Sequence, residues 1–222
     1  MIKYKVFNNF LDKGSIKEIN NLFDKLFLNN NDHNINSPSK NVLELIKLER
    51  LETIALFKLK NVISDLIISE TEYKVKFNKL WLVSTTYKDS NSGSLPYIAH
   101  FDKTRYLKAL IYLTDVDENC GPIHFVDEEF KDIEKRRLDL PDDYEKKGLN
   151  LINSKSKTKP IIANAGTLIL FDTNTPHHAG IVAKNYQRKI LRFDYSNKLW
   201  NKKSVINFNS IKTNLKKTLR LK

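Results

Sequence analysis

Cysteine is almost missing from this chain, since Cys120 is the only one among 222 residues. An intrachain disulfide is therefore excluded, as is typical of proteins kept in a reducing compartment. The start of the chain lacks the apolar segment of a signal peptide, and no apolar run approaches the roughly 20 residues that span a bilayer. These absences predict a cytoplasmic protein. Cys120 stands in an acidic turn with no neighbour that looks like its base, so we expect no catalytic role for it.

Acidic residues are missing from the C-terminal segment 197–222, which supplies eight of the twelve positive charges in the formal net charge of +12. Its apolar residues fall on one face of a predicted helix: Phe208, Ile211, Leu215 and Leu219. A basic amphipathic helix can bind an anionic membrane or nucleic acid. We expect this one to dock on its own protein with its lysines in water. No zinc-finger, P-loop, RRM-like or helix-turn-helix signature accompanies the charge, and no oligomeric state is indicated.

The chain is long enough for one sizeable domain, and its first part, 1–75, is expected to be a mostly helical support. A short strand is predicted at 2–7, and Ser15–Glu18 has the pattern of a capping box that opens a helix. Residues 41–69 are rich in Leu, Ile, Glu and Lys, and we predict a helix there, broken at most once. The Asn-rich segment between these helices is predicted to be a loop in which His33 is solvated.

Residues 76–196 have the features of a β-rich core. Runs of β-branched and aromatic residues, bounded by polar turns, predict a series of strands. These runs are 79–87, 106–114, 123–126, 166–172 and 187–195.

Two positions in this core have the spacing of metal ligands. His100 and Asp102 are two residues apart, so an extended strand directs both side chains to the same face. A second histidine from the distant segment 175–180 would complete two histidines and one carboxylate. That set binds Fe(II) in non-haem oxygenases and leaves coordination positions open. An H-x-D tripeptide alone is weak evidence for such a site.

The order of the motifs is more specific. H-F-D at 100–102 is followed by E-N-C-G-P-I-H-F-V at 118–126, G-T-L-I-L-F-D-T-N-T-P-H-H-A-G at 166–180 and Q-R-K-I-L-R-F-D-Y at 187–195. This order resembles the Fe(II)- and 2-oxoglutarate-dependent dioxygenases, most closely the phytanoyl-CoA dioxygenase-like branch. The resemblance implies a double-stranded β-helix (a jelly roll, cupin-like) with flanking α-helices. It also implies Fe(II), 2-oxoglutarate as cosubstrate and O2.

Carried over to this sequence, the resemblance implies that His100, Asp102 and His177 are the catalytic iron ligands. It also implies that Arg188 binds the distal carboxylate of 2-oxoglutarate. A guanidinium suits that task because it grips a carboxylate through two parallel hydrogen bonds. His178 is the alternative distal ligand. Arg192 is the alternative arginine: it has the same strand parity as Arg188, so both side chains are expected to face the barrel interior.

The chain departs from the family pattern at Asp127–Phe130, where relatives have Pro-Gly-Ser-His, so the role of that stretch is in doubt. Asp102 argues against the halogenating relatives, which have a small residue there. Residues 128–153 form a charged insertion, either a lid over the substrate or a solvated surface segment. His124 is expected to be structural, with lining of the substrate pocket as the alternative.

The sequence therefore predicts a hydroxylase that acts on an unactivated C–H bond of a small or medium-sized metabolite, and the basic balance favours an anionic one. Two alternatives stay open. The same chemistry acts on a protein or nucleic acid in one of them. In the other, the chain is a cupin-like metal-binding or sugar-binding protein without oxidative chemistry.

Overall fold

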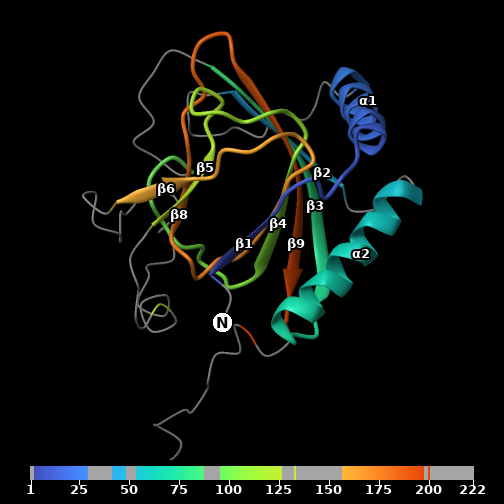
Figure 1. Cartoon of the computed structure of the whole chain (residues 1–222), viewed down its shortest axis with the longest axis vertical. Helices are drawn as coiled ribbons and strands as arrows, with labels where there is room; N and C mark the ends of the chain where they lie inside the picture. Colours follow the sequence, from blue (N-terminus) through green and yellow to red (C-terminus); the bar gives the residue numbers. More distant parts are fainter. Residues whose placement is uncertain are drawn as a thin grey trace, which may run out of the picture.

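The computed structural model describes residues 3–29, 42–48, 54–87, 96–126, 133, 157–197 and 200. Two antiparallel sheets face each other, and both helices lie on the outer side of the larger sheet (Figure 1). In chain order the elements are β1 (Tyr4–Phe7), α1 (Lys13–Asn29), β2 (Val42–Leu48), α2 (Ile54–Thr71), β3 (Lys76–Thr86), β4 (Leu107–Tyr112), β5 (Ile123–Val126), β6 (Thr158–Pro160), β7 (Leu168–Asp172), β8 (His177–Ala179) and β9 (Gln187–Ser196).

The connections between the sheets are those of a double-stranded β-helix. The larger sheet has the order β1-β7-β4-β9-β3-β2, and the smaller has the order β6-β5-β8. From β4 onward the chain passes to the smaller sheet for β5 and β6, returns for β7, crosses again for β8 and returns for β9. His100 extends the smaller sheet through an antiparallel bridge to His177. The predicted fold class, a jelly roll with flanking helices, is confirmed.

Alternation along the strands of the larger sheet separates two apolar cores. On β4, Leu107, Ala109 and Ile111 pack with residues of α1 and α2, whereas Leu110 and Tyr112 pack between the sheets. Strands β3, β7 and β9 of the same sheet follow this period of two, as expected where a sheet is buried on both faces. A polar side chain at an inward position of these strands is therefore held between the sheets, where a site can be built.

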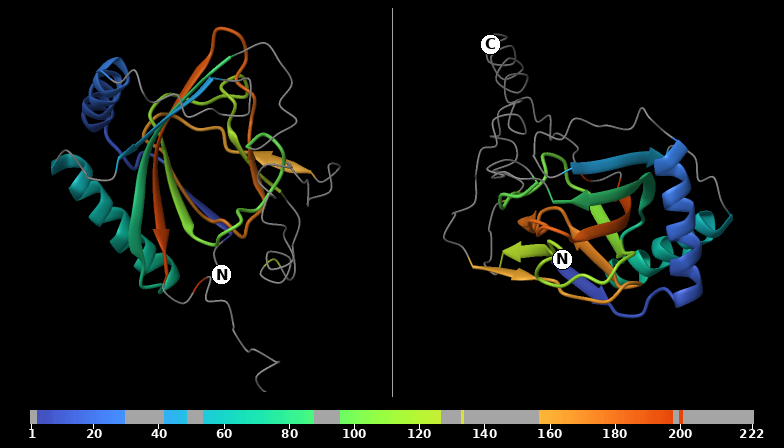
Figure 2. Two further views of the ribbon diagram at one scale, coloured as in Figure 1. Left: turned by 180° about the vertical axis from the view of Figure 1, so that it is seen from behind. Right: turned by 90° about the horizontal axis from the view of Figure 1, so that it is seen from above.

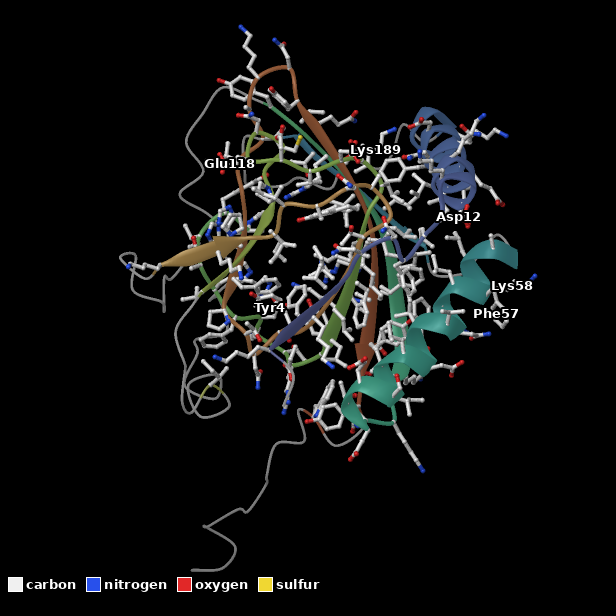
Figure 3. All side chains as sticks on the ribbon, in the orientation of Figure 1. Tyr4, Asp12, Phe57, Lys58, Glu118 and Lys189 are labelled. Atoms are coloured by element: carbon white, nitrogen blue, oxygen red, sulfur yellow. The ribbon has the colours of Figure 1, made fainter. Side chains whose placement is uncertain are left out.

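The helices cover the outer face of the larger sheet in both views of Figure 2. Phe57 and Lys58 project from α2 into solvent, while Tyr4 of β1 points between the sheets (Figure 3). There the Tyr4 ring stacks on Phe125 of β5 with ring centroids 4.3 Å apart. This contact joins the two sheets beside the distal histidine, since the Phe125 ring also lies 6.5 Å from that of His177.

The prediction of a helix over 41–69 is wrong for its first part. Residues 42–48 form β2, which pairs with β3 from Val42 opposite Thr86 to Leu48 opposite Leu80. The helix begins only at Ile54. Leu, Glu and Lys favour a helix locally, but β3 would otherwise expose a long edge of unpaired backbone groups. Pairing with that edge overrides the local preference.

The capping-box prediction for Ser15 is also corrected. Helix α1 begins at Lys13, and the preceding residue, Asp12, is its cap. The Asp12 carboxylate accepts hydrogen bonds from the backbone N–H and the hydroxyl of Ser15, both at 2.9 Å. These two bonds lower the pKa of Asp12. An aspartate is an equally good N-cap, so the helix starts earlier than the Ser-x-x-Glu pattern indicated.

Two glycines allow the chain to pass close to itself just after β8. Gly121 has a φ of +67°, and a Cβ added there would lie 2.5 Å from the Gly180 carbonyl oxygen. A Cβ on Gly180 would lie 2.8 Å from the Pro122 carbonyl oxygen. Neither position tolerates a side chain without a backbone shift. This close approach holds β8, which carries His177, against the start of β5.

Several predictions concern residues outside the described part of the chain. They are the Asn-rich loop with His33, most of the charged insertion 128–153, and the basic helix beyond Trp200. They stay predictions. Among the residues that are described, no helix is both long and apolar enough to cross a membrane.

Candidate metal centre

Backbone pairing brings the two histidine-bearing segments side by side. The His100 N–H donates to the His177 carbonyl at 3.0 Å, and the His177 N–H donates to the His100 carbonyl at 2.8 Å. Two residues on, the Asp102 N–H donates to the Thr173 carbonyl at 3.4 Å. The tripeptide 100–102 is thus held along β8 and the turn before it. This pairing brings His100 and Asp102 next to His177, which is far away in the sequence.

The three predicted ligands form one cluster. His100, Asp102 and His177 each offer a ligand atom, and these atoms lie within 4.8 Å of one another. The Oδ1 atom of Asp102 is 3.6 Å from His100 Nε2 and 3.8 Å from His177 Nε2. Both histidines are buried, with 6% and 4% of their surface exposed. Two imidazole nitrogens and one carboxylate oxygen at this spacing fit a first-row divalent metal with open coordination positions.

Backbone carbonyls orient both imidazoles. His100 Nδ1 lies 2.7 Å from the Ile98 carbonyl oxygen, and His177 Nδ1 lies 2.8 Å from the Thr175 carbonyl oxygen. A carbonyl only accepts, so each Nδ1 carries the proton and each Nε2 presents a lone pair. Metal-ligating histidines are commonly fixed in this way. In both cases the carbonyl belongs to the residue two positions earlier, a contact that the sequence did not reveal.

The protonation states of Asp102 and His177 suit metal binding. Burial by itself would raise the pKa of Asp102, but the Lys108 ammonium and the two histidines hold it well below its usual value. Burial, together with Lys108 and His100, also holds the pKa of His177 well below 6.5. At neutral pH the site therefore contains an ionised carboxylate and a neutral His177, the forms that bind a metal.

His178 points away from this cluster. On β8 it faces the opposite side from His177 and stacks on His124 of β5, with ring centroids 4.5 Å apart and planes inclined by 14°. Its Nδ1 lies 3.0 Å from the Ala179 carbonyl oxygen. The Nδ1 atom of His124 lies 3.3 Å from the Thr158 hydroxyl oxygen. The geometry thus places His177, and not its neighbour, with His100 and Asp102.

The paired histidines on the outer face make a pH-dependent contribution to stability. Burial, and then His178, lower the pKa of His124 to about 4. In the unfolded chain the value is about 6.5, so between these values the unfolded state binds more protons and stability falls as the pH falls. Above pH 6.5 the contribution is fully present. After a discount for partial exposure we expect about 1 kcal/mol, or about 2–4 °C in Tm.

The variant His124→Gln tests this expectation. Its Tm, followed by circular dichroism in metal-free buffer, should fall less steeply than that of the parent between pH 6.5 and pH 4. Parallel curves over this range would show that His124 is not responsible.

Arg188 is a buried cation with no carboxylate partner in the part of the chain that the structure describes. It is 3% exposed, and its Nε and Nη1 atoms find no hydrogen-bond partner among the described residues. Burial lowers the pKa of Arg188, and the groups that offset this effect are Tyr112, Tyr97 and Cys120. Two other buried polar atoms, Thr85 Oγ1 and Tyr97 Oη, also have no hydrogen-bond partner among the described residues. Thr85 is the cross-strand partner of Arg188, and Tyr97 is one of the groups that act on the pKa of Arg188.

A buried guanidinium is costly to leave unpaired, and so are buried hydroxyl groups. An anionic ligand with several acceptor oxygens would satisfy all three side chains together. The Arg188 region therefore has the character of a carboxylate-binding site.

Arg192 faces the same side of β9 but is already paired. It binds the Asp194 carboxylate through Nε at 2.7 Å and Nη2 at 2.9 Å, and Nη2 also donates to the Tyr106 hydroxyl at 2.9 Å. Asp194 additionally accepts from the Trp81 indole at 2.9 Å. The shared inward face of the two arginines, expected from strand parity, is borne out. Their environments differ, and Arg188 is the one available to a ligand.

Lys108 is a functional candidate that sequence reasoning missed. Its Nζ lies 2.7 Å from Asp102 Oδ2 and 3.2 Å from His177 Nε2. Burial lowers the pKa of Lys108, while Asp102 acts in the opposite direction. The available signal was a lysine at an inward position of an otherwise apolar strand.

Solved structures with this fold include 2-oxoglutarate-dependent enzymes. SnoN, a non-haem α-ketoglutarate-dependent epimerase from nogalamycin biosynthesis, matches with a TM-score of 0.65 and 20% identity over 87% of this chain and 77% of its own. HygX from Streptomyces hygroscopicus, solved with nickel and 2-oxoglutarate, has a TM-score of 0.59 and 11% identity over 88% and 83%. The collagen prolyl hydroxylase vCPH of Paramecium bursaria Chlorella virus 1 matches with a TM-score of 0.54 and 16% identity, over 87% of this chain and 96% of its own.

These identities are low, so the likeness shows a shared fold. No family model matches the chain, and no curated protein matches it significantly.

Proposed function

We propose that this chain, which has the double-stranded β-helix fold of the 2-oxoglutarate-dependent non-haem iron enzymes, is itself an Fe(II)- and 2-oxoglutarate-dependent oxygenase. One observation carries the proposal. A buried cluster of two histidines and one aspartate, His100, Asp102 and His177, occurs in the same barrel as Arg188, a buried guanidinium with unpaired donors. A metal-binding protein without a cosubstrate has no need for the second feature.

In this proposal the iron is held by Nε2 of both histidines and by Oδ1 of Asp102. Arg188 binds the distal carboxylate of 2-oxoglutarate through parallel hydrogen bonds. The hydroxyls of Thr85 and Tyr97 are the natural additional partners, because both are buried and neither has a hydrogen-bond partner among the residues that the structure describes. The bound iron, with 2-oxoglutarate and O2, supplies the oxidising power, and 2-oxoglutarate leaves as succinate and CO2. The protein orients these groups and excludes water.

The proposed reaction is hydroxylation of an unactivated C–H bond in a small or medium-sized metabolite. The net charge of +12 favours an anionic substrate. Support for a small molecule comes from neighbours of the same fold, such as HygX, which was solved with hygromycin B. SnoN is an epimerase and SnoK a carbocyclase, so this fold also serves other oxidative outcomes.

Succinate release tests the proposal. Protein purified without oxygen is given Fe(II), 2-oxoglutarate and air, and succinate is quantified with and without candidate metabolites. We expect slow succinate formation that requires Fe(II) and disappears in Asp102→Ala. A protein that binds metal but neither binds nor consumes 2-oxoglutarate would instead be a cupin-like binding protein.

A further inference from the structure

The two oxygens of Asp102 face different partners. Oδ1 faces the Nε2 atoms of the two histidines, at 3.6 Å and 3.8 Å. Oδ2 faces the ammonium of Lys108, at 2.7 Å. At that distance the ammonium and the carboxylate oxygen form a close, buried ion pair. The carboxylate is thus oriented with one oxygen toward the metal ligands and the other toward a lysine.

Lys108 is held in this position by the fold. It lies on β4, a central strand that pairs with β7 on one side and β9 on the other. The residue is 7% exposed, and its ammonium lies 5.4 Å from the Tyr106 ring centroid and 5.7 Å from that of Phe171. Burying an ammonium costs free energy that a methionine of similar size would not. The charge of Lys108 is therefore expected to have a function at this position.

We propose that Lys108 is a positioning residue that keeps Asp102 a one-oxygen ligand. A carboxylate can bind a metal through one oxygen or both. If Asp102 bound through both, it would occupy a coordination position that 2-oxoglutarate or O2 requires. The ion pair with Lys108 engages Oδ2 and so leaves only Oδ1 for the metal. This inference rests on the proposed function, because it assigns Lys108 a part in making the same metal site open to its cosubstrate.

The contact between Lys108 and His177 sharpens the expectation. Lys108 Nζ lies 3.2 Å from His177 Nε2. The ammonium can donate a hydrogen bond to the lone pair of this nitrogen only when the lone pair does not coordinate a metal. The ammonium therefore competes with a metal for this nitrogen and also repels its charge. Removing the ammonium should strengthen metal binding, or leave it unchanged, while 2-oxoglutarate binding weakens. Simple damage to the site would weaken both.

The experiment measures the two affinities separately. Co(II) is used as the probe metal, titrated into metal-free protein by calorimetry, and 2-oxoglutarate is then titrated into the Co(II)-loaded protein. For Lys108→Met we expect 2-oxoglutarate binding to weaken about tenfold or more. Removing a residue that contacts a metal ligand commonly changes the metal affinity or the activity of a site by at least this factor. Co(II) affinity should be equal to or higher than that of the parent. Lys108→Gln retains an N–H donor toward Oδ2 and should fall between the parent and Lys108→Met.

Lys189→Met is the matched control. Lys189 lies on the neighbouring strand β9, but its side chain points outward, where it pairs with Asp24 of α1 (Figure 3). This variant should bind Co(II) and 2-oxoglutarate as the parent does.

The possible outcomes distinguish a failure of the proposed function from a failure of the role assigned to Lys108. A parent protein that binds no 2-oxoglutarate in its Co(II) form contradicts the proposed function. A parent that binds it, with Lys108→Met and Lys108→Gln binding equally well, overturns the role of Lys108. Co(II) and 2-oxoglutarate affinities that fall together in both variants also overturn it, because they indicate general damage to the site.

Discussion

Arg188→Met is expected to lose 2-oxoglutarate binding by on the order of 100-fold or more while it still binds metal. Breaking a buried charge-assisted pair between a guanidinium and a carboxylate costs about 2–5 kcal/mol, and each 1.4 kcal/mol is a factor of ten in affinity. Arg188 is separate from the metal ligands, so the metal affinity should change little. Calorimetric titration of the metal-loaded protein measures both quantities.

The same substitution should raise the stability of the ligand-free protein. Nε and Nη1 of Arg188 are buried and have no hydrogen-bond partner within the described ranges. Replacing such a cation with an apolar side chain of similar size removes the cost of its desolvation. An increase of about 1 kcal/mol would raise Tm by about 2–4 °C for a chain of this length. Opposite changes in cosubstrate affinity and in Tm would identify Arg188 as a residue retained for binding.

Arg188→Lys is the finer test, because it keeps the charge but removes the fork of parallel donors. We expect it to bind 2-oxoglutarate more weakly than the parent and more tightly than Arg188→Met. Retention of full affinity in Arg188→Met would contradict the assignment.

His177→Ala is expected to reduce metal affinity by at least about 100-fold, whereas His178→Ala should leave it within a factor of a few. Loss of a partner of a ligand already costs 10–100-fold in typical sites, so loss of a ligand itself should cost at least as much. The two histidines are adjacent in sequence and face opposite sides of β8, which makes them a matched pair.

Titration of metal-free variants with Co(II) gives these affinities directly, and the metal content of the proteins as purified gives a second measurement. If His178→Ala lost metal binding and His177→Ala kept it, the distal ligand would be assigned to the wrong side of the strand.

The strands of the core followed from the residue patterns of the C-terminal two thirds, and the jelly roll from the resemblance of the motif order to the dioxygenases. Strands β3, β4, β5, β7 and β9 occur where runs of β-branched and aromatic residues predicted them, within a few residues. The failure at 42–48 has a physical cause. Its composition favours a helix, and only the unpaired edge of β3, distant in the chain, makes a strand more stable there.

For the site, the i, i+2 spacing of His100 and Asp102 and the motif order were enough to name the residues that the structure brings together. Sequence reasoning left His177 and His178 as alternatives, and likewise Arg188 and Arg192. Both choices depend on neighbours far apart in the chain. His124 stacks on His178, and Asp194, with Tyr106, engages Arg192.

By itself the sequence determined the strands of the core and a histidine and an aspartate two residues apart, because strand periodicity and local spacing are properties of short segments. The jelly roll and the distant histidine followed from the resemblance of the motif order to the dioxygenases. Only the tertiary structure decided which side chains have free donors and lone pairs. The Nε and Nη1 donors of Arg188, which find no partner among the described residues, and the Lys108 ammonium on Asp102 both depend on how separate strands lie together. Such contacts arise when the sheets pack face to face, and no short stretch of sequence encodes them.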